Sequence, residues 1–112
     1  MEPALKEVTT EQEKLDALAK EHGELHAFNT PHGRVAFRAP KFADYQRFTD
    51  KITDGKGSKF VTMRELALAC VVYPSREELV EVFDKMPGLV LNAATAIQEL
   101  AGTEVEGEVL KG

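Results

Sequence analysis

Apolar residues recur along this chain at helical spacing, and glycine or proline interrupts them at short intervals. The first helix is expected to begin at Thr9 or Thr10, because either can cap it, and Gly23 suits the left-handed position just after its end. Its apolar stripe is narrow among Glu, Lys and Asp. We therefore predict a helix that contacts the core lightly at most, preceded by a flexible N-terminus at residues 1–8.

The segment from residue 24 to residue 38 has a different character. Residues 34–38 alternate polar and apolar side chains, as a half-buried strand does. The turn formers of residues 29–33 separate them from the first part of the segment. This pattern predicts a β-hairpin. Because two strands alone are only marginally stable in water, one face of the hairpin must lie on helices.

Four further helices are predicted after the hairpin. The first covers residues 41–53, follows Pro40 and carries aromatic and aliphatic side chains at three- and four-residue spacing. The second, residues 58–72, is apolar on most faces, so we expect it to be the central element around which the others pack. Two more helices are expected, at residues 75–86 and 89–101.

These elements define an α+β fold that is mostly helical, with an N-terminal helix, a β-hairpin and then a cluster of four helices. A chain of 112 residues is long enough for one hydrophobic core and leaves little room for a second. We therefore predict a single domain at residues 9–102. Residues 103–112, TEVEGEVLKG, place sparse apolar side chains among glutamates and are predicted to form a flexible acidic tail.

Charge and composition narrow the function classes. The formal net charge is −5, and the basic residues do not cluster, so nucleic-acid binding is disfavoured. The longest apolar run, residues 66–73, is far too short to span a bilayer, so no membrane partner is expected. The acidic N-terminus lacks the order of a signal peptide, and the single cysteine cannot form an intrachain disulfide. We expect a cytoplasmic protein.

Three histidines lie close together in the sequence, at His22, His26 and His32. A structural zinc site needs four ligands, usually with cysteines, and a catalytic one needs three ligands and a water. Here the spacing crosses a helix end and a strand with no cysteine nearby, although Glu24 could complete a set. Exposed histidines on a short connection are the favoured interpretation. We predict no metal and no cofactor.

Catalysis has little support in the sequence. Cys70 could act as a nucleophile if a neighbouring base lowered its pKa, but it lies in the most apolar helix. Burial there would raise the pKa of the thiol, so a packed core cysteine is the favoured interpretation. The sequence contains no GxSxG, HExxH, CxxC or EF-hand pattern. We predict that the protein is not an enzyme.

Two segments are candidates for binding a protein partner. The helix at 41–53 carries the aromatic and arginine side chains that interface hot spots use, although an aromatic stripe at this spacing usually faces the core. The tail has apolar side chains that could become ordered on a partner, or it could be an unstructured, solubilising end. The candidate residues are Phe42, Tyr45, Arg47 and Phe48 in the helix, and Val105, Val109 and Leu110 in the tail.

Four sequence segments occur in the order HGRVAFRAP, FADYQRF, RELALACVVYPSREEL and IQELAG, within a stretch that covers about two-thirds of the chain. In the order of these segments the chain resembles the tail assembly chaperones of tailed bacteriophages. The resemblance implies a non-enzymatic helper in the host cytoplasm. Such a helper coats the long tape-measure protein and keeps it soluble until tail-tube subunits polymerise around it. This chain would correspond to the shorter of two forms, with a frameshifted extension departing at its tail.

Two other protein-binding roles remain open from the sequence. One is a small regulatory or inhibitory adaptor that binds a host protein, and the other is a minor structural subunit of the virion. A homo-oligomer is compatible with each role. The resemblance transfers a role and no individual site residue to this chain.

Overall fold

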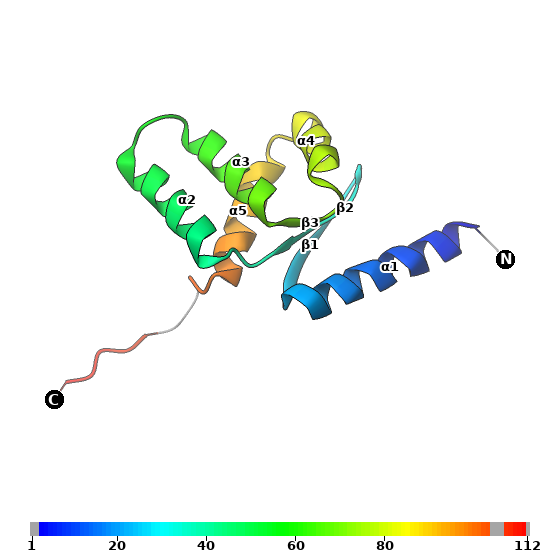
Figure 1. Ribbon diagram of the computed structural model, residues 1–112, viewed down its shortest axis with the longest axis horizontal. Coiled ribbons are helices and arrows are strands. Elements are labelled where there is room, and N and C mark those ends of the chain that lie inside the picture. The colour runs from blue at the N-terminus through cyan, green and yellow to red at the C-terminus, as the bar shows by residue number, and fades with distance from the viewer. Residues whose placement is uncertain (1–2, 104–106, 112) are drawn as a thin grey trace.

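The computed structural model describes residues 3–103 and 107–111. It confirms the predicted α+β class, mostly helical, with an N-terminal helix and a β-hairpin (Figure 1). The elements are α1 (Pro3–His22), β1 (Leu25–Thr30), β2 (Gly33–Arg38), α2 (Phe42–Asp54), α3 (Lys59–Cys70), β3 (Val71–Tyr73), α4 (Arg76–Lys85) and α5 (Leu89–Leu100). Among the described helices, none combines the length and the apolar character needed to cross a membrane.

The start of the first helix differs from the prediction. Helix α1 begins at Pro3 rather than at Thr9 or Thr10, so most of the stretch predicted to be flexible, residues 1–8, is helical. Proline is favoured in the first helical position, because its missing N–H would have no helical partner there in any case. The predicted end is confirmed, since Gly23 follows the helix with a φ of 84°.

The hairpin forms as predicted, with β1 and β2 paired in register from Leu25 opposite Arg38 to Thr30 opposite Gly33. The Thr30 hydroxyl stabilises the turn, because it donates to the Gly33 carbonyl oxygen at 2.7 Å and accepts from the His32 N–H at 3.0 Å. Gly33 has a φ of 111°, which residues with a side chain rarely adopt.

A third strand was not predicted from the sequence. The helix expected at residues 58–72 ends at Cys70, and Val71–Tyr73 pairs instead with the free edge of β2, with Tyr73 opposite Ala36. The sheet order is β1-β2-β3, antiparallel throughout. β-Branched and aromatic residues suit a pleated, half-buried surface, so the sequence Val-Val-Tyr favours the strand once a partner edge is available.

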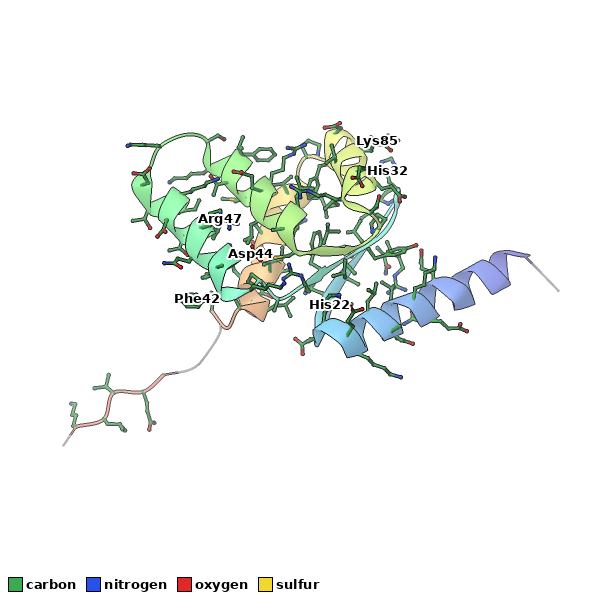
Figure 2. The ribbon with its side chains drawn as sticks, in the orientation of Figure 1. His22, His32, Phe42, Asp44, Arg47 and Lys85 are labelled. Atoms are coloured by element: carbon green, nitrogen blue, oxygen red, sulfur yellow. The ribbon has the colours of Figure 1, made fainter. Side chains whose placement is uncertain are left out.

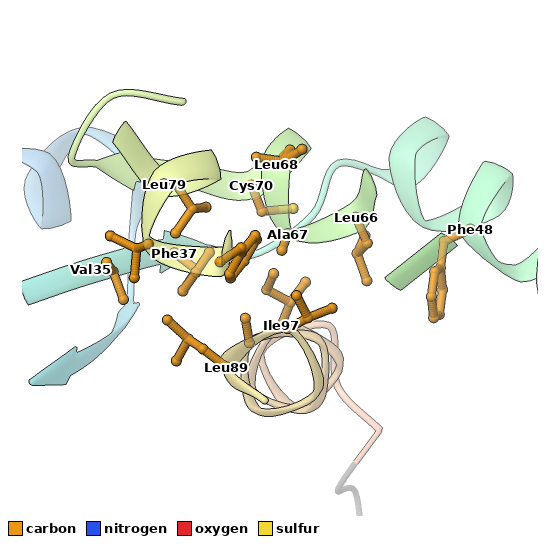
Figure 3. Packing of buried hydrophobic residues seen from close by; sticks show 14 residues of the cluster. Val35, Phe37, Phe48, Leu66, Ala67, Leu68, Cys70, Leu79, Leu89 and Ile97 are labelled. Atoms are coloured by element: carbon orange, nitrogen blue, oxygen red, sulfur yellow. The ribbon is translucent and has the colours of Figure 1, made fainter. Parts of the chain in front are cut away.

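The core lies between one face of the sheet and the helices α3, α4 and α5, with Phe48 of α2 at its edge (Figure 3). The segment predicted to be central, residues 58–72, is buried in its middle part, where Leu66, Ala67 and Leu68 are at most 8% exposed. Its first residues are exposed, with Phe60 at 41%, and its last residues are half-buried in β3. Helix α5 is equally central. Its buried residues are Leu89, Val90, Ala93, Ala94, Ala96 and Ile97.

Helix α1 covers the opposite face of the sheet. Its Leu15 is 6% exposed, and Ala36 at the centre of β2 is fully buried even though its side chain alternates with the core-facing Val35 and Phe37. Polar contacts accompany this packing: the Tyr73 hydroxyl donates to Glu11 Oε2 at 2.7 Å. The fold therefore has three layers, with the sheet between α1 and the helical cluster.

The molecule is elongated. Its radius of gyration is 16.3 Å, whereas a compact domain of this length has about 13 Å. Figure 1 shows the cause, since α1 extends past the sheet on one side and residues 107–111 extend away from the body on the other. The protein therefore exposes two projecting segments.

Arg38 joins three elements at the end of β2. Its guanidinium donates to the Ala69 carbonyl oxygen at 2.8 Å and to the Ala39 carbonyl oxygen at 2.9 Å. It also lies 3.6 Å from the Asp44 carboxylate in the first turn of α2. Because Ala69 is near the carboxyl end of α3, the cation also interacts favourably with the helix dipole. Arg38 thus positions the start of α2 beside the end of α3.

Candidate functional site

A groove of about 310 Å³ runs between α2 and α3, and we call it the α2–α3 groove. Phe48 and Leu66 supply apolar surface to its lining. Both side chains belong to the hydrophobic core, at 9% and 3% exposure, so the groove reaches down to the core. Arg76, the first residue of α4, also lines it.

Charged side chains line the rest of the groove. Three are basic, Arg47, Lys51 and Arg76, and two are acidic, Asp44 and Glu65. The groove therefore carries a formal charge of +1 on a chain whose net charge is −5. An acidic group that approaches the protein meets its own sign over most of the surface and the opposite sign here.

Two ion pairs lie in the groove lining, one within α2 and one between α2 and α3. Arg47 Nη1 lies 3.5 Å from Asp44 Oδ1, and Lys51 Nζ lies 3.1 Å from Glu65 Oε2. The Arg47 side chain is 63% exposed and the Lys51 side chain 45%. Such exposed pairs contribute little to stability, because water screens them. Both cations can therefore exchange these partners for the carboxylates of a ligand.

The aromatic candidates on α2 do not form a single surface. Tyr45 and Phe48 pack together with ring centroids 5.8 Å apart and turn toward the core, while Phe42 is 84% exposed. At 3.6 residues per turn, Arg47 lies about 140° around the helix from Phe42. Phe42 is thus available to a partner, whereas Phe48 is core. Arg47 belongs to the groove (Figure 2).

The apolar candidates in the tail are open to solvent where the structure describes them. Val109 is 86% exposed and Leu110 81%. The third candidate, Val105, lies outside the described residues. No residue pattern in the sequence pointed to the α2–α3 groove, because its lining comes from three helices.

The three histidines are not brought together. His22 and His32 lie at opposite ends of the hairpin (Figure 2). The His26 ring packs on Phe28, with centroids 4.6 Å apart. In the part of the chain that the structure describes, no three His, Cys, Asp or Glu side chains are arranged to hold a metal ion.

Cys70 is fully buried, as its position in the apolar helix predicts. Burial raises the pKa of its thiol from 9.0 to about 11, the nearby Arg38 guanidinium lowers it, and Asp44 raises it. The pKa of the Tyr73 hydroxyl is also raised, chiefly because it donates a hydrogen bond to Glu11. Neither group is prepared to act as a nucleophile at neutral pH.

Cys70 should therefore resist thiol reagents in the folded protein. A shift of the pKa from 9.0 to about 11 reduces the thiolate fraction at pH 8 about a hundredfold, and burial removes access as well. We expect negligible reaction with Ellman's reagent in native buffer and complete reaction in guanidinium chloride. Stoichiometric labelling within minutes under native conditions would contradict the buried position.

Comparison with known proteins places this α+β fold in a family. The family model described as a domain of unknown function, DUF6848, matches residues 18–109, so the chain belongs to that family. The fold is also similar to that of a solved structure, uncharacterised protein rbstp2171 from Bacillus stearothermophilus. The two share 26% sequence identity and superpose with a TM-score of 0.66, over 86% of this chain and 99% of the other. Comparison with curated proteins finds no match.

Proposed function

We propose that this protein is a non-enzymatic assembly chaperone that binds a long helical protein in the cytoplasm of a host cell. The partner proposed is the tape-measure protein of a tailed bacteriophage. The order of the four sequence segments from HGRVAFRAP to IQELAG supports this role. The role itself requires a surface that holds apolar segments of a partner reversibly.

The observation that supports protein binding is the exposure of large apolar side chains on three different helices. They are Phe42 on α2, Phe60 and Val61 on α3, and Leu91 on α5. Single exposed apolar residues are common on protein surfaces. An aromatic ring that is 84% exposed on a rigid helix is more informative, because it offers large contact area at a low cost in conformational entropy.

The binding free energy that these side chains can supply suits a chaperone. Burying one such side chain against a partner contributes about 1.5–3 kcal/mol. One contact is too weak to hold a protein, and several together give binding that remains reversible. Reversibility is required here, because the chaperone must leave the tape-measure protein when tail-tube subunits arrive.

Co-expression tests this proposal. With a tape-measure reading frame encoded beside the gene, we expect the two proteins to co-purify and the soluble fraction of the partner to increase severalfold. Phe42→Ser should abolish most of that increase, because it removes the exposed ring. Asp50→Ser, an exposed polar position on the same helix, is the matched control. A partner that is equally insoluble with and without this chain would disprove the proposal.

One observation favours a second candidate, a regulatory adaptor. Strand β1 pairs only with β2 and forms an edge of the described sheet, and such an edge can accept an additional strand from a partner. Beside it, a space of about 240 Å³ between β1 and α5 is lined by His26, Phe28 and Glu99, among others. Strand addition would protect β1 amides from hydrogen exchange, whereas binding through Phe42 would leave them unchanged.

A further inference from the structure

We propose that the C-terminal segment of one copy of this chain, residues 103–111, docks in the α2–α3 groove of a second copy. The groove and the segment are different surfaces, so each added copy presents a new groove and a new segment. Head-to-tail contacts of this kind produce rings or open chains. The inference does not depend on the proposed chaperone role.

The segment has the composition of a ligand for a basic groove. Glu104, Glu106 and Glu108 outnumber Lys111, so residues 103–111 carry a formal charge of −2. The glutamates occupy every second position. In an extended conformation they would point to one side of the segment together with Leu110, and Val105 and Val109 would point to the other. An extended segment thus combines an acidic edge with an apolar edge.

The groove matches both edges. Its basic side chains extend from α2 and α4, and Phe48 and Leu66 provide apolar surface beneath them. The side chain of Arg76 forms no ion pair with any acidic residue that the structure describes. Arg47 and Lys51 are in exposed pairs that a ligand can displace. The groove can therefore supply up to three cations to the glutamates of the segment.

The length of the segment agrees with the length of the helix that borders the groove. Helix α2 has 13 residues and is about 20 Å long, at 1.5 Å per residue. An extended strand rises about 3.3 Å per residue, so six or seven residues of the segment would lie along the whole helix. Such a stretch is long enough to bring the glutamates and Val109 to the groove together.

The occupant is a second copy rather than the same chain. Residues 107–111 point away from their own body (Figure 1). Val109 and Leu110 are left more than four-fifths exposed in the isolated chain. An apolar pair in that position gains burial by meeting another molecule. Because the contact combines ion pairs with a small apolar area, we expect association that weakens as salt screens the charges.

The test uses the full chain, a chain ending at Gly102, and a labelled peptide of sequence TEVEGEVLKG. Sedimentation velocity should show mass increasing with concentration for the full chain and a monomer for the shortened one.

Fluorescence anisotropy should show the peptide binding to the shortened chain. The double change Arg47→Glu and Arg76→Glu should weaken that binding at least tenfold. The double change Lys14→Glu and Lys20→Glu, at two exposed positions of α1, is the matched charge reversal and should have little effect.

Charge exchange provides the decisive experiment. A chain with Glu106→Lys and Glu108→Lys should not associate with itself, and it should associate with the chain carrying the reversed groove. Circular dichroism melts check that every variant is folded. The proposal is overturned if the shortened chain associates as the full chain does, or if the peptide binds the reversed groove equally well. It is also overturned if the segment occupies its own groove in a chain that stays monomeric.

Discussion

Replacing Phe37 by alanine is expected to lower the free energy of unfolding by about 3–5 kcal/mol, the range measured for large aromatic residues in protein cores. Phe37 is fully buried in β2, among the core residues (Figure 3). Its ring meets Phe28 edge to face, with centroids 6.1 Å apart. Its removal loses burial and leaves a cavity between the sheet and the helices. Urea denaturation followed by circular dichroism measures the change.

Phe42→Ala is the matched control for this experiment. The same side chain is lost, but Phe42 is 84% exposed, so the free energy of unfolding should change by no more than about 0.5 kcal/mol. Equal losses in the two variants would contradict the packing described here. A small effect would also establish that replacing Phe42 tests binding without disturbing the fold.

Replacing Arg38 by methionine is expected to lower the free energy of unfolding by at least about 3 kcal/mol. Methionine keeps the apolar part of the side chain, so the loss reports the charged hydrogen bonds, each of which contributes about 1.5–3 kcal/mol. The carbonyl oxygens of Ala39 and Ala69 lose their donor, and Asp44 keeps only the more exposed Arg47. Hydrogen exchange should show that the first turn of α2 opens more readily.

Lys51→Met is the control for Arg38. Lys51 also pairs with a carboxylate, at 3.1 Å, but both side chains are about half exposed. Its loss should cost less than about 1 kcal/mol and should vanish in high salt. The effect at Arg38, whose side chain is 16% exposed, should persist in high salt. If Arg38→Met is as mild as Lys51→Met, Arg38 does not position α2.

Much of the fold could be predicted from local patterns. Two of the helices predicted after the hairpin begin as expected, because Ser58 and Ser75 cap α3 and α4, and each hydroxyl accepts from the backbone N–H three residues later. The hairpin turn and the glycine that ends α1 are also local features. Each depends on residues within one or two turns of each other. That is why the sequence alone was sufficient for them.

The candidate site was predicted less well. Aromatic periodicity on α2 correctly indicated a face directed to the core, where Tyr45 and Phe48 lie. The same pattern could not show that Phe42 and Arg47 lie outside that face. The α2–α3 groove was missed, because it exists only where residues from three helices meet. The position of α2 beside α3 depends on Arg38, which belongs to neither helix.

The sequence by itself determined the order of the helices and the hairpin, where the hairpin turns, and that Cys70 lies in an apolar helix. Only the tertiary structure decided that Val71–Tyr73 leaves that helix for a strand, and that α1 covers the second face of the sheet. The physical reason is the range of the interactions. Helix caps and turns are satisfied by near neighbours, whereas β3 forms because β2, distant in the sequence, offers an edge with unpaired hydrogen-bonding groups.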